Sequence, residues 1–276
     1  MITAGIDVGS LSTKAVIMKN GEVLTSSIIL TTPDSEESAK MVMSQALNQA
    51  TLKLEDIRYI VGTGYGRVNI PFANSTVTEI SCHARGAQAQ NKNVRTILDM
   101  GGQDCKAIRC DSRGRVVNFA MNDKCAAGTG RFLERVAAAV GYPLDQIGPL
   151  SLQGTGKELQ ISPTCAVFAE MDILKLMRMK EEIADILGSA FESLVRRLQG
   201  LLGRVGVEST LCISGGVGKN VGIVKRLERN LKMEVFLPSD PQLVGAYGGA
   251  LIGLEKLDNQ VEARLEERRT LNAGTA

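Results

Sequence analysis

An internal repeat constrains the fold of this chain more than any other feature of its sequence. The segment GIDVGSLSTKAVI, which starts at Gly5, aligns without gaps onto ILDMGGQDCKAIR, which starts at Ile97. Asp7 then aligns with Asp99. In each copy an apolar strand ends in an Asp and a glycine turn, and a second strand, a polar turn and a third strand follow. The sequence therefore predicts a duplicated hairpin unit.

Helical patterns follow both copies, and short apolar strands lie between them. Residues 35–53 and 181–206 carry apolar side chains at helical spacing, and a last helix is expected over residues 242–257. This order of elements is typical of an α/β protein with mixed sheets. We expect two lobes, the first built from residues 1–93 plus 251–276 and the second from residues 94–250.

Composition excludes several classes of protein. The 276 residues are 44% hydrophobic, and the formal net charge is +2, which gives no bias toward nucleic acid. No basic segment precedes an apolar run at the start, and no run approaches the roughly 18 apolar residues of a membrane helix. Six irregularly spaced cysteines do not make a secreted disulfide framework. We expect a cytoplasmic protein without a membrane or nucleic-acid partner.

The repeated hairpins carry the chemistry of a nucleotide site. An Asp followed by a glycine turn places a carboxylate beside free backbone N–H groups, which suit Mg²⁺ through water and phosphate oxygens. A third glycine loop, ISGGVGKN, joins a strand to a helix and lets its backbone approach a base or ribose. Each turn alone is more often a tight connection, but the three together favour a nucleotide triphosphate clamped between two lobes. A P-loop NTPase is not expected, because GxxxxGK[ST] does not occur.

The segments DVGSLSTK, LDMGGQDCKAI and ISGGVGKN resemble the phosphate 1, phosphate 2 and adenosine motifs of the actin, sugar kinase and Hsp70 ATPase superfamily. The resemblance implies a duplicated ribonuclease H-like fold, with two lobes around a cleft that binds ATP or ADP with Mg²⁺. It places Asp7, Gly9, Ser10, Ser12, Thr13 and Lys14 in the first phosphate loop, Asp99, Gly101, Gly102, Gln103 and Asp104 in the second, and Gly215, Gly216, Gly218 and Asn220 at the adenosine.

Three of these residues have expected catalytic roles. Asp7 faces the Mg²⁺, and Gln103 or Asp104 positions the attacking water, because phosphoryl transfer depends mainly on positioning and electrostatics. Leu11 departs from the small or polar residue that is usual in the first loop, so that one side-chain contact to phosphate is missing.

Two cysteines need a different explanation. Cys125 and Cys165 each lie just before a helical pattern, and a helix N-terminus lowers the pKa of a thiol. Thiolate ligands are the chemical expectation, with a buried packing role as the alternative. Two thiolates complete neither a Zn²⁺ site nor a cubane cluster, but two identical subunits on a twofold axis would provide four.

The segments MNDKCAAGTGRFLE, SPTCAVFAE, GTGYGR and EISCHARGA resemble the BadF/BadG/BcrA/BcrD-type ATPases, which include activators of 2-hydroxyacyl-CoA dehydratases and ATPase subunits of benzoyl-CoA reductase. The resemblance implies a dimer that holds one [4Fe-4S] cluster between its subunits at Cys125 and Cys165. ATP hydrolysis then drives a low-potential electron from ferredoxin or flavodoxin into a CoA-ester dehydratase or reductase. MNDKCAAGTG favours the homodimeric activator, whereas MDILKLM departs from the polar residues expected after SPTCAVFAE.

Two other functions remain open on the sequence alone. One is a metabolite kinase of the same superfamily with structural cysteines, and the other is a nucleotide-gated cluster or Zn²⁺ sensor that switches partners. Cys105, Cys110 and Cys212 lie in strand patterns, where we expect packing. The one histidine, His83, is expected to be structural, with a role in coupling the lobes as the alternative. From Asp258 onward the mixed charges indicate a frayed helix or disorder.

Overall fold

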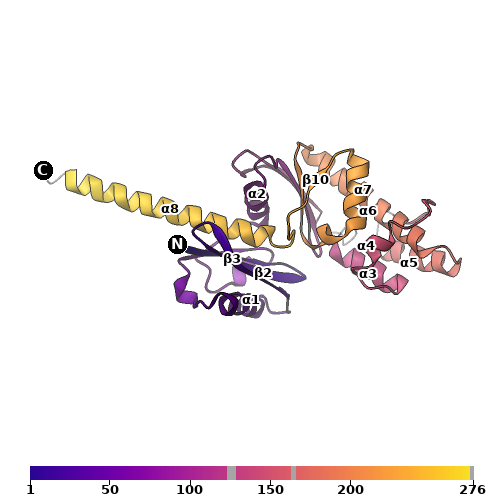
Figure 1. Ribbon diagram of the computed structural model, residues 1–276, viewed down its shortest axis with the longest axis horizontal. Coiled ribbons are helices and arrows are strands. Elements are labelled where there is room, and N and C mark those ends of the chain that lie inside the picture. Colours follow the sequence, from indigo (N-terminus) through magenta and orange to yellow (C-terminus); the bar gives the residue numbers. More distant parts are fainter. Residues whose placement is uncertain (123–128, 163–165, 274–276) are drawn as a thin grey trace. The chain divides into compact units, whose positions relative to one another are not determined.

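Residues 1–122, 129–162 and 166–273 are described by the computed structural model of the chain. The chain packs as two compact units (Figure 1). Unit 1 contains residues 1–86 and 245–276, and unit 2 contains residues 87–244. Unit 1 is therefore made from both ends of the chain, and unit 2 from one continuous segment.

Each unit is built on one five-stranded mixed sheet, and the two sheets have the same strand order. The order is β3-β2-β1-β4-β5 in unit 1 and, read from the matching edge, β8-β7-β6-β9-β10 in unit 2. The first strand of each unit pairs antiparallel with the second and parallel with the fourth. The strands are β1 (Ile2–Val8), β2 (Ser12–Lys19), β3 (Glu22–Leu30), β4 (Tyr59–Thr63), β5 (Ser75–Thr76), β6 (Thr96–Met100), β7 (Cys105–Cys110), β8 (Val116–Asn122), β9 (Leu211–Ser214) and β10 (Val235–Phe236).

The duplicated hairpin is confirmed, and the duplication is longer than the sequence repeat indicates. It includes the fourth strand of each sheet, β4 and β9, which returns in parallel beside the first strand. The α/β class with two mixed sheets is likewise confirmed.

Alternation along β1 sends its side chains to two different layers. Ala4, Ile6 and Val8 belong to an apolar core with α1 (Ser35–Ala50), which lies along β2 and β3 (Figure 1). The α1 helix begins where the sequence predicts it, because the Asp34 side chain accepts hydrogen bonds from the backbone N–H groups of Glu36 and Glu37.

The other face of β1 meets α8 (Val244–Ala273), and this contact depends on glycine. A Cβ added to Gly5 would lie 1.9 Å from the backbone oxygen of Ala246, so the helix rests directly on the strand. Thr3 Oγ1 donates a 3.0 Å hydrogen bond to the backbone oxygen of Ala250. At Gly248, α8 lies equally close to α2 (Glu79–Gln90), where a Cβ would be 1.8 Å from the Cys82 backbone oxygen.

Helices in unit 2 enclose the larger of the two cores. They are α3 (Gly130–Val140), α4 (Ile147–Leu150), α5 (Ala166–Arg178), α6 (Ile183–Val205) and α7 (Val221–Leu231). The core joins Leu98 and Met100 of β6 to an apolar face of α6 that includes the fully buried Phe191. Short 3₁₀ turns η1 (Leu54–Asp56), η2 (Arg67–Asn69) and η3 (Gly216–Lys219) complete the assignment.

The C-terminal segment is helical, which agrees with the first of the two states expected for it, a frayed helix or disorder. The backbone of α8 continues past Asp258 to Ala273. The segment VEARLEERR is rich in strong helix formers, and their propensity prevails over the low hydrophobicity. Within the described residues, none of the helices is both long and apolar enough to cross a membrane.

Four cysteines are buried within the two units. Cys105, Cys110 and Cys212 lie in β7 and β9 as packing residues, as their strand patterns predict, and Cys82 lies in α2. Burial raises the pKa of the Cys82 thiol to about 12 and that of Cys110 to about 11, and it also raises the pKa of Cys105 and Cys212. These side chains are neutral apolar filler at physiological pH.

The contact at Gly248 predicts the effect of a single methyl group. We expect Gly248→Ala to lower the free energy of unfolding by about 1–3 kcal/mol, because the methyl would meet a backbone oxygen that belongs to another helix. Gly203→Ala is the matched control, since its Cβ would meet no atom within 4 Å in α6, and it should add up to about 1 kcal/mol through helix propensity. Urea denaturation measures both, and equal effects would contradict the close packing of α8.

The raised thiol pKa values predict the reactivity of the four buried cysteines. At pH 8 a thiol with a pKa of 11 or 12 is ionised in about one molecule in 1000 or fewer, and the thiolate is the reacting form. We expect Cys82, Cys105, Cys110 and Cys212 to resist iodoacetamide in the native protein and to react fully in denaturant. Peptide mass spectrometry reads each site separately, and rapid native labelling of Cys110 would show that β7 is not packed as described.

Candidate functional site

In unit 1, the first hairpin holds a buried acid opposite a lysine. Asp7 lies at the end of β1 and faces Lys14 of β2 in the strand register, and its Oδ2 is 3.2 Å from Lys14 Nζ. Asp7 is only 5% exposed. A carboxylate buried to this extent needs a countercharge, and Lys14 provides it.

The turn that follows Asp7 is held by its own backbone and by one threonine. Gly9 donates a 3.1 Å backbone hydrogen bond to Ser12, and a Cβ at Gly9 would lie 3.0 Å from Lys14 Nζ. Thr31 Oγ1 donates to the Gly9 backbone oxygen at 2.8 Å and lies 2.8 Å from Thr13 Oγ1. The Thr13 side chain is therefore hydrogen-bonded within the protein, whereas Ser10 is exposed at the tip of the turn.

The second hairpin, in unit 2, repeats this arrangement with one more acid. Lys106 faces Asp99 in the register and is itself 3% exposed. Its Nζ lies 3.6 Å from Asp99 Oδ2 and 2.7 Å from Asp104 Oδ1. Ser214 Oγ donates to Asp99 Oδ1 at 3.2 Å, so Asp99 is fixed from two sides. Gln103 is exposed at the turn.

Each of the two aspartates also packs against a glycine that follows the neighbouring parallel strand. Gly64 follows β4 with φ +85°, and its Cβ would lie 2.4 Å from Asp7 Oδ1. Gly215 follows β9 with φ +84°, and its Cβ would lie 2.8 Å from Asp99 Oδ1. The positive φ and the close carboxylate both require glycine.

Gly64 is a site residue that sequence reasoning did not find. The available signal was the similarity between VGTGYG at 61–66 and ISGGVG at 213–218, where a small polar residue and a glycine end a strand in each copy.

The third glycine loop connects β9 to α7 as predicted. Gly215, Gly216 and Gly218 lie in it, and the Cβ of Gly218 would be 3.0 Å from the Ile213 side chain. Asn220 is the N-cap of α7, where its Oδ1 accepts a 3.1 Å hydrogen bond from the Ile223 N–H. The Asn220 side chain therefore holds the helix in place behind the loop.

The turn of the second hairpin is joined directly to α3, the helix that follows Cys125 in the sequence. Gly130 donates a 2.9 Å backbone hydrogen bond to Gly101, and Arg131 donates a 3.0 Å bond to Gly102. These two N–H groups belong to the first turn of α3, so the loop carbonyls satisfy donors that the helix itself leaves free. Cys125 and Cys165, the predicted metal ligands, lie outside the described residues.

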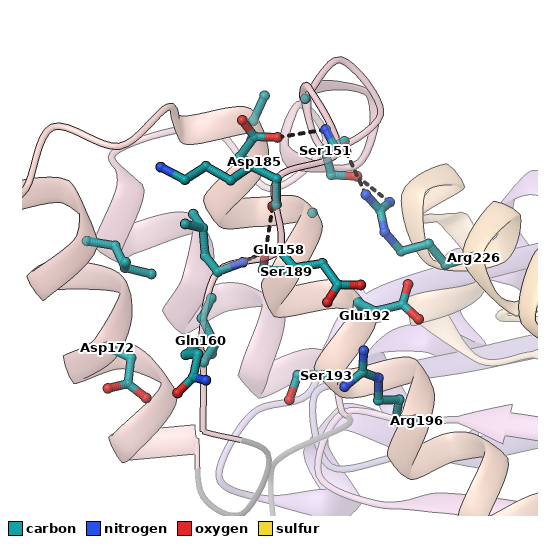
Figure 2. A pocket seen from close by; sticks show the side chains of 18 of the residues that line it. Ser151, Glu158, Gln160, Asp172, Asp185, Ser189, Glu192, Ser193, Arg196 and Arg226 are labelled. Carbon is teal, nitrogen blue, oxygen red and sulfur yellow. Dashed lines mark hydrogen bonds between the residues drawn. The ribbon is translucent and has the colours of Figure 1, made fainter.

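A separate pocket of about 1220 Å³ lies in unit 2 between residues 151–162 and the helices α5, α6 and α7 (Figure 2). Several of its polar groups bind one another. The buried Arg226 donates to the backbone oxygen of Ser151 at 2.7 Å, and Asp185 accepts from Thr155 Oγ1 at 2.8 Å and from the Gly156 N–H at 3.1 Å. The pocket contains none of the predicted nucleotide-binding residues, and these bonds shape the connection that leads to α5.

The structure thus gathers the predicted nucleotide residues into two clusters, one in each unit. Asp7, Gly9 and Lys14 lie together in unit 1. Asp99, Gly101, Asp104 and Gly215 lie together in unit 2. In chemical terms, each cluster offers a fixed carboxylate, an ammonium group paired with it and a glycine turn, which together suit a magnesium-bound phosphate chain.

Comparison with known proteins identifies the family that this chain matches. Residues 4–253 match the BadF/BadG/BcrA/BcrD ATPase family. The chain is 42% identical over 255 residues to the activator of lactoyl-CoA dehydratase from Anaerotignum propionicum, which covers 92% of this chain and 98% of that protein.

Solved structures agree with the sequence comparison. The activator of the 2-hydroxyisocaproyl-CoA dehydratase from Clostridium difficile, solved with bound ADPNP, superposes with a TM-score of 0.89 at 37% identity and covers 95% of this chain and 98% of its own. A ROK family glucokinase from Streptomyces griseus shares the fold alone, with a TM-score of 0.58 at 11% identity over 92% of this chain and 100% of its own. The resemblance deduced from the motifs is confirmed, and the chain belongs to the BadF/BadG/BcrA/BcrD ATPase family.

Proposed function

We propose that this ATPase is an activator that couples ATP hydrolysis to the transfer of a low-potential electron from a [4Fe-4S] cluster to a partner enzyme of the 2-hydroxyacyl-CoA dehydratase type. The observation that carries the proposal is the pair of Asp–Lys–glycine clusters, one in each unit of a chain that is similar along almost its whole length to two dehydratase activators. The two carboxylates with their glycine turns support ATP binding. The similarity to dehydratase activators supports the coupling of ATP hydrolysis to electron transfer.

In this proposal the two units are the lobes of the ATPase. Their bounds, residues 1–86 plus 245–276 and residues 87–244, lie within a few residues of the predicted lobes, 1–93 plus 251–276 and 94–250. Asp7 and Asp99 hold Mg²⁺ through water, while backbone N–H groups that follow Gly9 and Gly101 in the two turns bind phosphate oxygens. The loop at Gly215–Gly218 receives the adenosine. The ADPNP bound to the related activator supports this assignment of ATP or ADP as ligand.

The cysteines divide into those that suit an iron–sulfur cluster and those that do not. Cys82, Cys105, Cys110 and Cys212 are buried thiols with raised pKa values, and they are committed to the two cores. Cys125 and Cys165 remain as the thiolate donors, and each precedes a helix, α3 at Gly130 and α5 at Ala166.

Two thiolates per chain fit a [4Fe-4S] cluster only if two chains share it, which supports a homodimer. When bound, the cluster supplies a one-electron carrier of low potential. The chain's own residues hold it at Cys125 and Cys165 and bind the nucleotide whose hydrolysis drives the transfer. A ferredoxin or flavodoxin serves as electron donor in this proposal, and a CoA-ester dehydratase or reductase component is the acceptor.

Anaerobic purification tests the proposal directly. We expect about two irons and two acid-labile sulfides per chain in a dimer, both lost in Cys125→Ser and in Cys165→Ser. Cys110→Ser is the matched control, since this thiol is buried in β7, and it should keep its iron. The purified dimer should hydrolyse ATP. When a reductant is supplied, it should also pass electrons to a dehydratase that is the partner of a related activator.

Other results of the same experiment would point elsewhere. An iron-free monomer that phosphorylates a small molecule would overturn the proposal in favour of a metabolite kinase. A protein with zinc or with a cluster that accepts no electron, and with ATPase that only switches partner binding, would replace it by a sensor.

The residue that positions the attacking water can be assigned by comparing two variants. Gln103→Ala should lower the kcat of ATP hydrolysis by about 100-fold with little change in the melting temperature, because this side chain is exposed at the turn. Gln153→Ala, an exposed glutamine of the same unit, is the control. If Gln103→Ala keeps full turnover and Asp104→Asn loses it, the role belongs to Asp104. The melting temperature of Asp104→Asn must be measured, since Asp104 also pairs with Lys106.

A further inference from the structure

His83 is a buried polar residue that lies next to the acid of the first hairpin. It is 4% exposed and lies in α2. A Cβ added to Gly245, in the first turn of α8, would be 2.8 Å from His83 Nε2 and 3.1 Å from Asp7 Oδ2. The imidazole edge and the carboxylate oxygen therefore approach the same point beside the backbone of Gly245.

His83 and Asp7 lie close together because of how the layers of unit 1 pack. Thr3, Gly5 and Asp7 share one face of β1, and α8 runs along that face, with Ala250 at Thr3, Ala246 at Gly5 and Gly245 at Asp7. The contact between Gly248 and the Cys82 backbone brings α2 against α8. His83 follows Cys82 in α2, and it therefore lies beside Asp7, the last of the three residues on this face of β1.

The surroundings of Asp7 indicate what His83 does there. The terminal torsion of an Asp side chain has only broad preferences, so neighbouring atoms must fix the plane of the carboxylate. Gly64 packs against Oδ1, Lys14 Nζ is 3.2 Å from Oδ2, and the His83 imidazole lies on the Gly245 side of that same oxygen. Asp7 is thereby enclosed by groups from β2, α2, α8 and the residue that follows β4.

We propose that His83 is a positioning residue for ATP hydrolysis, which fixes the Asp7 carboxylate in the orientation needed for nucleotide-bound Mg²⁺, and that Gly245 is required as the spacer between them. The inference rests on the proposed nucleotide site and adds to it a residue that acts through Asp7. Groups that orient a metal-binding carboxylate typically change metal affinity or activity by 10- to 100-fold when removed.

The experiment compares His83→Ala, His83→Gln and His83→Asn in the full chain. The readouts are the Mg²⁺ concentration for half-maximal ATPase, the kcat, and the Kd of ADP measured without Mg²⁺. We expect His83→Ala to raise the Mg²⁺ requirement by about 10-fold or more and leave the Mg²⁺-free ADP affinity unchanged. A glutamine amide reaches the position of Nε2, whereas an asparagine amide reaches that of Nδ1, so glutamine should restore Mg²⁺ use better than asparagine.

Two further variants separate positioning from stability. Gln88→Ala removes another buried polar side chain of α2, whose Nε2 donates to the Ser112 backbone at 2.6 Å, and it should lower the melting temperature without altering Mg²⁺ use. Gly245→Ala should reproduce the Mg²⁺ defect with His83 intact, because its methyl would occupy the point between the two side chains.

The outcomes distinguish this inference from the function on which it rests. A wild type that hydrolyses ATP with Mg²⁺, together with a His83→Ala protein of unchanged Mg²⁺ requirement, would overturn the role of His83 alone. Equal defects in the glutamine, asparagine and alanine variants, matched by Gln88→Ala, would mean that His83 only packs. A wild type that binds no Mg²⁺–ATP would overturn the nucleotide site and the inference together.

Discussion

The burial of one carboxylate at the end of the first strand in each sheet is the constraint from which the rest of the site follows. Removing an ionised group from water costs several kcal/mol unless a countercharge and hydrogen bonds replace the lost solvation. Asp7 and Asp99 obtain the countercharge from the residue directly opposite, Lys14 and Lys106. A slip of one residue in either hairpin would turn the lysine to the other face, so the buried charge also fixes the register.

The two copies keep the same backbone but have different polar networks. Among the described residues Lys14 pairs with Asp7, whereas Lys106 is shared between Asp99 and Asp104. Ser214 also bonds to Asp99. The second hairpin is additionally tied to α3 through the carbonyls of its turn, a link that joins this turn to the chain segment beyond Cys125. The two copies therefore place Asp7 and Asp99 at equivalent positions, but the polar groups bonded around these two carboxylates differ.

Local pattern made much of this predictable. The alignment of Asp7 with Asp99 already implied two hairpins, and alternation along the strands implied which residues are buried. The proximity of His83 to Asp7 could not be predicted, because it depends on α8 returning from the far end of the chain and resting on glycines at 5 and 248. Gly64 was hidden for a similar reason, since its need for a positive φ arises only when β4 lies beside β1.

The divided origin of unit 1 has a consequence for biosynthesis. β1 leaves the ribosome well before α8, because the acceptor of the Thr3 hydroxyl, the Ala250 carbonyl, follows 247 residues later. At typical rates of translation the delay before α8 appears is on the order of ten seconds, long enough for a continuous segment such as unit 2 to fold. During that time the Asp7 face of β1 has no helix to cover it. The hairpin of Asp7 and Lys14 can form early, because its turn is held by residues no later than Thr31. A chain that stops short of Gly245 nevertheless leaves the face of Thr3, Gly5 and Asp7 without its covering helix, open to chaperones and proteases.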